Sequence, residues 1–203
     1  MKAPAQPPLD RIAKTLEADD FAVYLNEKSE EVPFDQLFIS LGEDEQKRPF
    51  VLQMLFVNDL TNIMELEEKE EDAALLQHFL TFPFTASPIT VPELSKLVLM
   101  LNRIIPIGAF GLDINQGTLY FQYVLASKDR EVNKTVILET VSMIGMFVME
   151  FAKKLEAVAT GEKRAQEIIK SLEEVGLFIP PLAPMPNLSE TMAQEPEPPQ
   201  TKV

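Results

Sequence analysis

His78 is the only side chain of this sequence that titrates near neutral pH, which makes it the first candidate for a catalytic base or a metal ligand. Either role needs a partner group, and the nearest carboxylates are Glu70, Glu71 and Asp72, which precede it in the same segment. Asp72 lies six residues before His78, outside the i, i+3 and i, i+4 spacings at which side chains of a helix meet. We therefore expect His78 to be a partly buried structural residue without a chemical role.

The acidic run from Glu65 to Asp72 offers a second candidate, because its carboxylates could bind calcium. Calcium-binding loops alternate their oxygen ligands and place a glycine at the sharp turn, and this run has neither feature. We interpret residues 65–82 as an acidic, helical insertion whose first turn is exposed to solvent. Within it, residues 68–80 are predicted to form a helix that carries Leu75, Leu76, Phe79 and Leu80 on one side.

The rest of the composition excludes most catalytic classes. The chain has no cysteine, which removes thiolate nucleophiles, disulfides, iron–sulfur clusters and cysteine-ligated zinc. The serines lack the strand–turn–helix context of a nucleophile elbow, and Gly108 and Gly111 lack the lysine of a phosphate-binding loop. Glu93 and Asp113 remain as candidates for hydrolysis by carboxylates alone. We expect a protein that is not an enzyme and that holds no cofactor and no metal.

Charge and hydropathy narrow the class of partner. The formal net charge is −14, which argues against nucleic acid, because binding to phosphates requires a basic patch. The acidic excess lies mainly in residues 1–72, whereas residues 73–131 are neutral. The most apolar stretch, 141–152, is shorter than the roughly 20 residues that cross a bilayer. We expect no membrane insertion and a cytoplasmic location, with which the lack of cysteine is compatible.

Proline marks the limits of the folded part. Residues 1–8 are predicted to be a flexible N-terminus, residues 9–178 a single domain, and residues 179–203 a disordered proline-rich tail. The segment Pro-Pro-Leu-Ala-Pro-Met-Pro in this tail could dock in a partner's groove, since proline-rich segments lose little entropy on binding. A solubilising tail is the simpler interpretation.

Hydrophobic periodicity predicts an α+β fold. Helices are expected at 9–16, 91–105, 132–159 and 162–175, and strands at 21–25, 36–41, 50–57, 107–114 and 118–125. Strands joined by short turns pair antiparallel, and helices grouped between and after them cover one face of the sheet. In the last strand Leu119, Phe121 and Tyr123 share one face, and Tyr120, Gln122 and Val124 share the other.

The helix at 132–159 is apolar around most of its circumference. One stripe repeats with alternating spacings of four and three and is expected to cover the sheet; it comprises Ile137, Val141, Ile144, Val148, Phe151, Leu155 and Val158. A second stripe contains Met143, Met146, Phe147 and Met149. It needs another cover, either a helix of the same chain or a partner, and methionine gives a surface that adapts to a partner.

Residues 101–125 resemble the corresponding helix end and hairpin of the YbjN-like family, bacterial proteins described as sensory transduction regulators. The matching residues are Leu101, Asn102, Pro106, Gly108, Phe110, Gly111, Asp113, Gly117, Tyr120 and Phe121. The resemblance implies the α-β-β-β-α-β-β-α plan of type III secretion chaperones over residues 9–159, with an inserted helix at 65–82 and an extra helix at 162–175. Chaperones with this fold are acidic homodimers that hold an extended segment of a client.

Together these observations predict a non-enzymatic, protein-binding protein of the chaperone-like or regulatory adaptor kind. Its apolar helix and sheet surface would include Met143, Met146, Phe147, Met149, Phe110 and Tyr120. The partner would be a protein client, a regulator or, in a homodimer, a second copy. The alternative is a small-molecule-sensing module, with a pocket between the sheet and the helix at 92–105 lined by Phe110, Tyr120 and Tyr123.

Overall fold

The computed structural model describes residues 6–63 and 73–177, which form an α+β fold with one antiparallel sheet. The predictions made for residues 1–5, for the acidic run and for the tail beyond Leu177 lie outside the described residues. The helices are α1 (Pro8–Glu17), α2 (Val57–Ile63), α3 (Val91–Leu101), α4 (Lys134–Ala159) and α5 (Ala165–Glu174). The strands are β1 (Val23–Asn26), β2 (Gln36–Glu43), β3 (Pro49–Phe56), β4 (Ala74–Thr85), β5 (Ala109–Asp113) and β6 (Thr118–Ser127).

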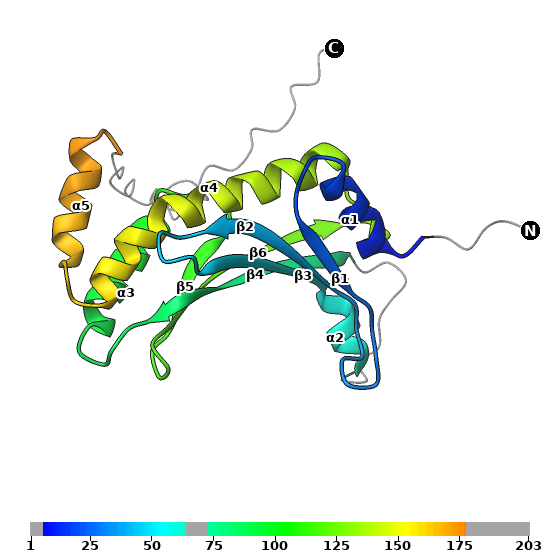
Figure 1. Ribbon diagram of the computed structural model, residues 1–203, viewed down its shortest axis with the longest axis horizontal. Coiled ribbons are helices and arrows are strands. Elements are labelled where there is room, and N and C mark those ends of the chain that lie inside the picture. The colour runs from blue at the N-terminus through cyan, green and yellow to red at the C-terminus, as the bar shows by residue number, and fades with distance from the viewer. Residues whose placement is uncertain (1–5, 64–72, 178–203) are drawn as a thin grey trace, which may run out of the picture.

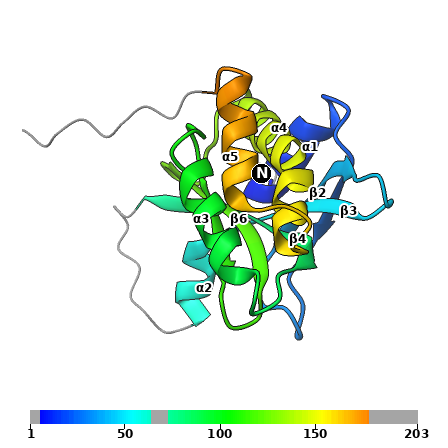
Figure 2. The ribbon, with the colours of Figure 1, turned by 90° about the vertical axis from the view of Figure 1, so that its left-hand side faces the viewer.

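The sheet has the order β1-β2-β3-β4-β6-β5, and every neighbouring pair is antiparallel. The predicted hairpins β2–β3 and β5–β6 are both present. Helix α4 crosses one face of the sheet, with α1 and α3 on the same side, whereas both views place α2 on the other side, at one end (Figures 1 and 2). One face of the sheet is thus covered by a layer of helices, as the order of elements predicted.

The stripe of α4 that was predicted to cover the sheet is buried along its whole length. All seven residues from Ile137 to Val158 in that stripe are at most 2% exposed. Asn133 caps the start of the helix, because its side-chain oxygen accepts hydrogen bonds from the backbone of Thr135 at 2.8 Å and of Val136 at 3.4 Å. The helix ends before Gly161, whose φ of +82° reverses the chain toward α5.

Two predictions for residues 65–82 are wrong: the helix at 68–80, and the placement of Leu75, Leu76, Phe79 and Leu80 on one side of it. The helix at 68–80 is absent over its described part, which is instead the start of β4, a central strand paired with β3 and β6. The alternate residues that face the helices are Ala74, Leu76, His78, Leu80, Phe82 and Phe84. Leu75 and Phe79, on the opposite face, are apolar as well, so the pattern of apolar pairs imitates a helix. The segment forms a strand and not a helix because β4 pairs with β3 and β6 in the centre of the sheet.

The segment that carries the family resemblance is explained by backbone geometry. The side chain of Asn102 pairs with Phe110 through both backbone groups: its Nδ2 donates to the carbonyl at 2.9 Å, and its Oδ1 accepts from the amide at 2.8 Å. This amide therefore ties the end of α3 to β5. Gly117 has a φ of +68°, and a Cβ there would overlap the carbonyl of Ala86.

His78 is fully buried on the helix-facing side of β4. Neither ring nitrogen has a hydrogen-bond partner of good geometry among the described residues. Burial lowers the pKa of His78 from 6.5 to about 4, against a smaller opposing effect of the backbone at Tyr123 and Leu76. The imidazole is therefore neutral at neutral pH and acts as a core residue.

The stability of the protein should depend on pH through this residue. The unfolded chain binds a proton at His78 near pH 6.5, and the folded chain binds it only near pH 4. The free energy of unfolding should therefore fall by about 3 kcal/mol as the pH decreases across this interval. His78→Leu removes this titrating group, so urea unfolding of the variant should show a clearly smaller fall over the same interval, which comes from carboxylates whose pKa the fold lowers. Equal slopes for the two proteins would contradict a neutral, buried imidazole.

Candidate functional site

The second face of the sheet, here called the open face, carries uncharged side chains on all of its central strands. The strand register connects Tyr24, Phe38, Gln53, Phe79 and Gln122 in one row across five strands. Along the middle of the strands, the residues that alternation places on the open face are Tyr24, Phe38, Ser40, Val51, Gln53, Leu55, Leu75, Gln77, Phe79, Thr81, Tyr120, Gln122 and Val124. None of these carries a charge, although 25% of the chain is Asp, Glu, Lys or Arg. The register adds two charged residues at strand ends, Glu43 opposite Pro49 and Asp113 opposite Thr118.

Large apolar side chains of the open face contact solvent. Tyr24 is 65% exposed, Val124 46% and Val51 39%. The rings of Tyr24 and Phe38 stack at 6.3 Å between centroids, and those of Phe79 and Tyr120 stack at 5.4 Å. Of the described helices only α2 lies on this side, at one end of the sheet (Figure 1). The open face is thus an apolar surface that α2 covers only at one end, where Leu55 is buried, and that no other described helix covers.

Tyr120, which the sequence predicted as a partner-binding residue, lies on the open face. Its ring occupies the space that a Cβ at Gly111 would fill on the neighbouring strand β5. The glycine therefore lets the tyrosine lie flat on the sheet, with Phe79 beside it. Sequence reasoning missed the other members of this surface. Their signal was the placement of apolar residues at adjacent positions of β4, together with the absence of charge in β3, β4 and β6.

Of the four residues predicted on the second stripe of α4, Met146 faces away from the sheet, whereas the Met149 side chain reaches Gly42 of β2, 3.9 Å from where a Cβ of that glycine would be. Met146 is 56% exposed, Met149 is 40% exposed, and Phe147 and Met143 are half-buried. A groove of about 510 Å³, here called the α4 groove, is lined by Ile104, Met146, Phe147, Met149, Glu150, Phe151 and Leu177. The apolar stripe is therefore partly covered by the ends of α3 and α5, and the rest is open.

The prediction that Phe110 belongs to a binding surface is wrong. Phe110 is 2% exposed and packs with its ring centroid 5.3 Å from Phe121, 6.0 Å from Phe82 and 6.1 Å from Phe151. It faces α4, whereas Tyr120 faces away from it. Tyr123 lies on the side of Phe110, with its ring 5.5 Å from that of His78. Because Phe110 and Tyr120 lie on opposite faces of the sheet, they cannot line the single pocket that a small-molecule sensor would need.

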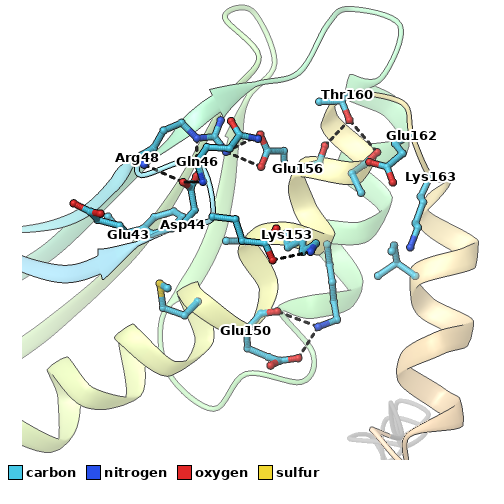
Figure 3. A pocket seen from close by; sticks show the side chains of 17 residues that line it. Glu43, Asp44, Gln46, Arg48, Glu150, Lys153, Glu156, Thr160, Glu162 and Lys163 are labelled. Carbon is cyan, nitrogen blue, oxygen red and sulfur yellow. Dashed lines mark hydrogen bonds and ion pairs between the residues drawn. The ribbon is translucent and has the colours of Figure 1, made fainter.

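A charged cleft of about 670 Å³ lies between the β2–β3 turn, the end of α4 and the start of α5 (Figure 3). Arg48 is at its centre and donates to both carboxylate oxygens of Glu156, at 2.7 and 2.8 Å, and to Asp44 Oδ2 at 2.6 Å. At the rim Lys153 pairs with Glu45 at 2.9 Å, and Lys154 pairs with Glu150. These three cations and four carboxylates leave one excess negative charge, and the Arg48–Glu156 and Lys153–Glu45 pairs join the hairpin to α4.

The pKa shifts in this cleft favour ionised groups. The pKa of Asp44 is lowered: partial desolvation raises it, but hydrogen bonds from the backbone and side chain of Arg48 and from the backbone of Gln46 lower it by more. The hydrogen bond to Glu156 raises the pKa of Arg48. Asp44 is thus a carboxylate at neutral pH that serves as an acceptor, and it is not suited to donate a proton as a general acid.

The two carboxylates considered for hydrolysis have structural partners. Glu93 pairs with Lys96 and accepts a hydrogen bond from the backbone of Ala165 at 3.1 Å, which links α3 to the start of α5. Both interactions lower the pKa of Glu93, and the hydrogen bond from Lys96 has the larger effect. Asp113 accepts from the backbone of Asn115 at 2.9 Å and of Gln116 at 3.2 Å, so it stabilises the β5–β6 turn.

Two further features bear on metals and membranes. Within residues 6–63 and 73–177 no group of three or more His, Asp or Glu side chains could hold a metal ion. Helix α4, with 26 residues, is long and apolar enough by composition to cross a bilayer. Its most apolar stripe is, however, packed against the sheet, and the core helix of a globular domain meets the same criterion.

Comparison with models of known protein families found no match to this chain, and comparison with curated proteins found no significant relative.

The charged cleft should contribute stability through Arg48 only. Glu156→Gln leaves the packing in place but removes the charge that holds Arg48, and it should lower the free energy of unfolding by about 1–2 kcal/mol, as for a lost charge-assisted hydrogen bond. Glu45→Gln removes the exposed pair at the rim and should leave the urea midpoint unchanged. Equal effects of the two substitutions would contradict the structural role assigned to Arg48.

Proposed function

We propose that this protein is a non-enzymatic, protein-binding protein that acts as a chaperone-like or regulatory adaptor through its open face. The single observation that carries the proposal is an exposed sheet surface whose central part has no charge, in a chain of which a quarter is charged. A solvent-facing side of an antiparallel sheet ordinarily alternates polar and charged residues with the buried ones. The apolar, uncharged centre of the open face favours contact with another surface.

The residue types of the open face match those of binding interfaces. The central part of a protein–protein interface is depleted of charge and enriched in aromatic residues, which bury a large area at a low cost in entropy. Tyr24, Phe38, Phe79 and Tyr120 supply such rings, and Gln53 and Gln122 offer amides between them that can hydrogen-bond to a partner.

Charge favours a partner other than a second copy. Two identical chains would each bring a net charge of −14 to the contact, and the resulting repulsion opposes a homodimer. We therefore propose a client or regulator whose contact surface is apolar and whose surroundings are neutral or basic. Membership of the YbjN-like family and a chaperone-like fold are part of this proposal, except that the homodimer of such chaperones is not expected to form through the open face. They are supported by the resemblance of residues 101–125, and a cytoplasmic location is compatible with a chain that lacks cysteine.

Photo-crosslinking in cells tests this function. We place p-benzoylphenylalanine at Val51 or at Val124, two exposed positions of the open face, and at Gln166, an exposed position of α5. The two open-face positions should give the same discrete product, and Gln166 should not give it. A product of twice the chain mass would identify a second copy and overturn the proposed hetero-partner.

A charge on the open face provides the matched control. With the crosslinker at Val51, Val124→Glu should reduce the product about tenfold or more, because the partner would have to desolvate a carboxylate. Val124 is exposed, so the urea midpoint of the variant should stay unchanged. Products that are identical from all three positions, or that persist with Val124→Glu, would contradict the proposal.

A further inference from the structure

The α4 groove is a separate apolar surface that the proposed function does not use. It lies on the side of α4 that faces away from the sheet, between Ile104 after α3 and Leu177 after α5. Met146 and Met149 leave about half of their side chains exposed in it, whereas Phe151 at its base is buried. A groove of this composition gains free energy when an apolar segment covers it.

The end of α5 directs the chain to this groove. Gly176 has a φ of +84°, and its amide donates to the carbonyl of Glu173 at 3.0 Å, while the amide of Leu177 donates to Leu172 at 3.0 Å. This pair of hydrogen bonds is a Schellman motif, which fixes the direction of the residues that follow a helix. Leu177 itself lines the α4 groove, so the next residues start beside it.

The sequence after Leu177 suits an apolar groove. Residues 178–186 read Phe-Ile-Pro-Pro-Leu-Ala-Pro-Met-Pro and carry no charge. Proline restricts the unbound chain, which lowers the entropy lost on docking. An extended polyproline segment rises about 3.1 Å per residue, so five residues span about 15 Å, comparable to ten residues of a helix. The segment is therefore long enough to follow the exposed stripe of α4.

We propose that residues 178–186 occupy the α4 groove of their own chain and cover Met146, Phe147 and Met149. A segment tethered beside its site has an effective concentration of about a millimolar or more, so even a weak apolar contact keeps it bound. This assignment concerns the side of α4 opposite the sheet and stands independently of the proposed function.

Oxidation of methionine in the full chain tests the assignment. Peroxide modifies a methionine at a rate that follows its exposure, and mass spectrometry reads each site separately. The double substitution Ile179→Ser with Leu182→Ser should release the segment and raise the oxidation rates of Met146 and Met149 by about fivefold or more. Met54, which is fully buried in the core, serves as the internal reference.

Leu188→Ser provides the matched control, because it changes an apolar residue of the tail outside the proposed segment. It should leave both oxidation rates at the level of the original chain. Unchanged rates in the double variant would overturn the proposal. If the protection of Met146 and Met149 in the original chain and in Leu188→Ser disappears on dilution, the proposal is also overturned. That result would assign the α4 groove to a second copy of the chain.

Discussion

The packing of α4 on one face of the sheet is the contact on which the rest of this structure depends. A single helix of 26 residues supplies the stripe from Ile137 to Val158 that covers the strands, and α1 and α3 extend this layer. With α1, α3 and α4 on one side, the chain has two apolar surfaces that the described core does not use. One is the open face, and the other is the outer side of α4.

Sequence patterns predicted the parts of the fold in which apolar residues keep a regular spacing over many turns or in which a turn is specified. The stripe of α4 and the β5–β6 hairpin around Gly117 are such cases. Strand β4 was mistaken for a helix because Leu75 and Phe79 are apolar on the side that faces solvent. Local periodicity reports burial, and it fails where an exposed face is apolar for another reason. The error in the fold thus lies at the surface that we assign to partner binding.

The candidate site could be predicted only in part for a related reason. Alternation in β6 places Tyr120, Gln122 and Val124 on one face, but it does not indicate which face the helices cover. Phe110 was misassigned because its neighbours in space, Phe82 and Phe151, come from distant parts of the chain. The residues that resemble the YbjN-like family serve turns, close approaches and the core, as Asn102 and Gly117 illustrate. Their chemistry therefore contains no information on a substrate.

The central claim, that the open face is covered by a partner in the cell, can be measured directly because the chain has no cysteine. Val51→Cys and Val124→Cys each introduce one thiol on the open face, and Gln166→Cys introduces one on α5. Maleimide labelling of the two open-face thiols should be about tenfold slower in intact cells than in the dilute purified protein, relative to the α5 thiol. Equal relative rates in cells and in the purified protein would contradict the account.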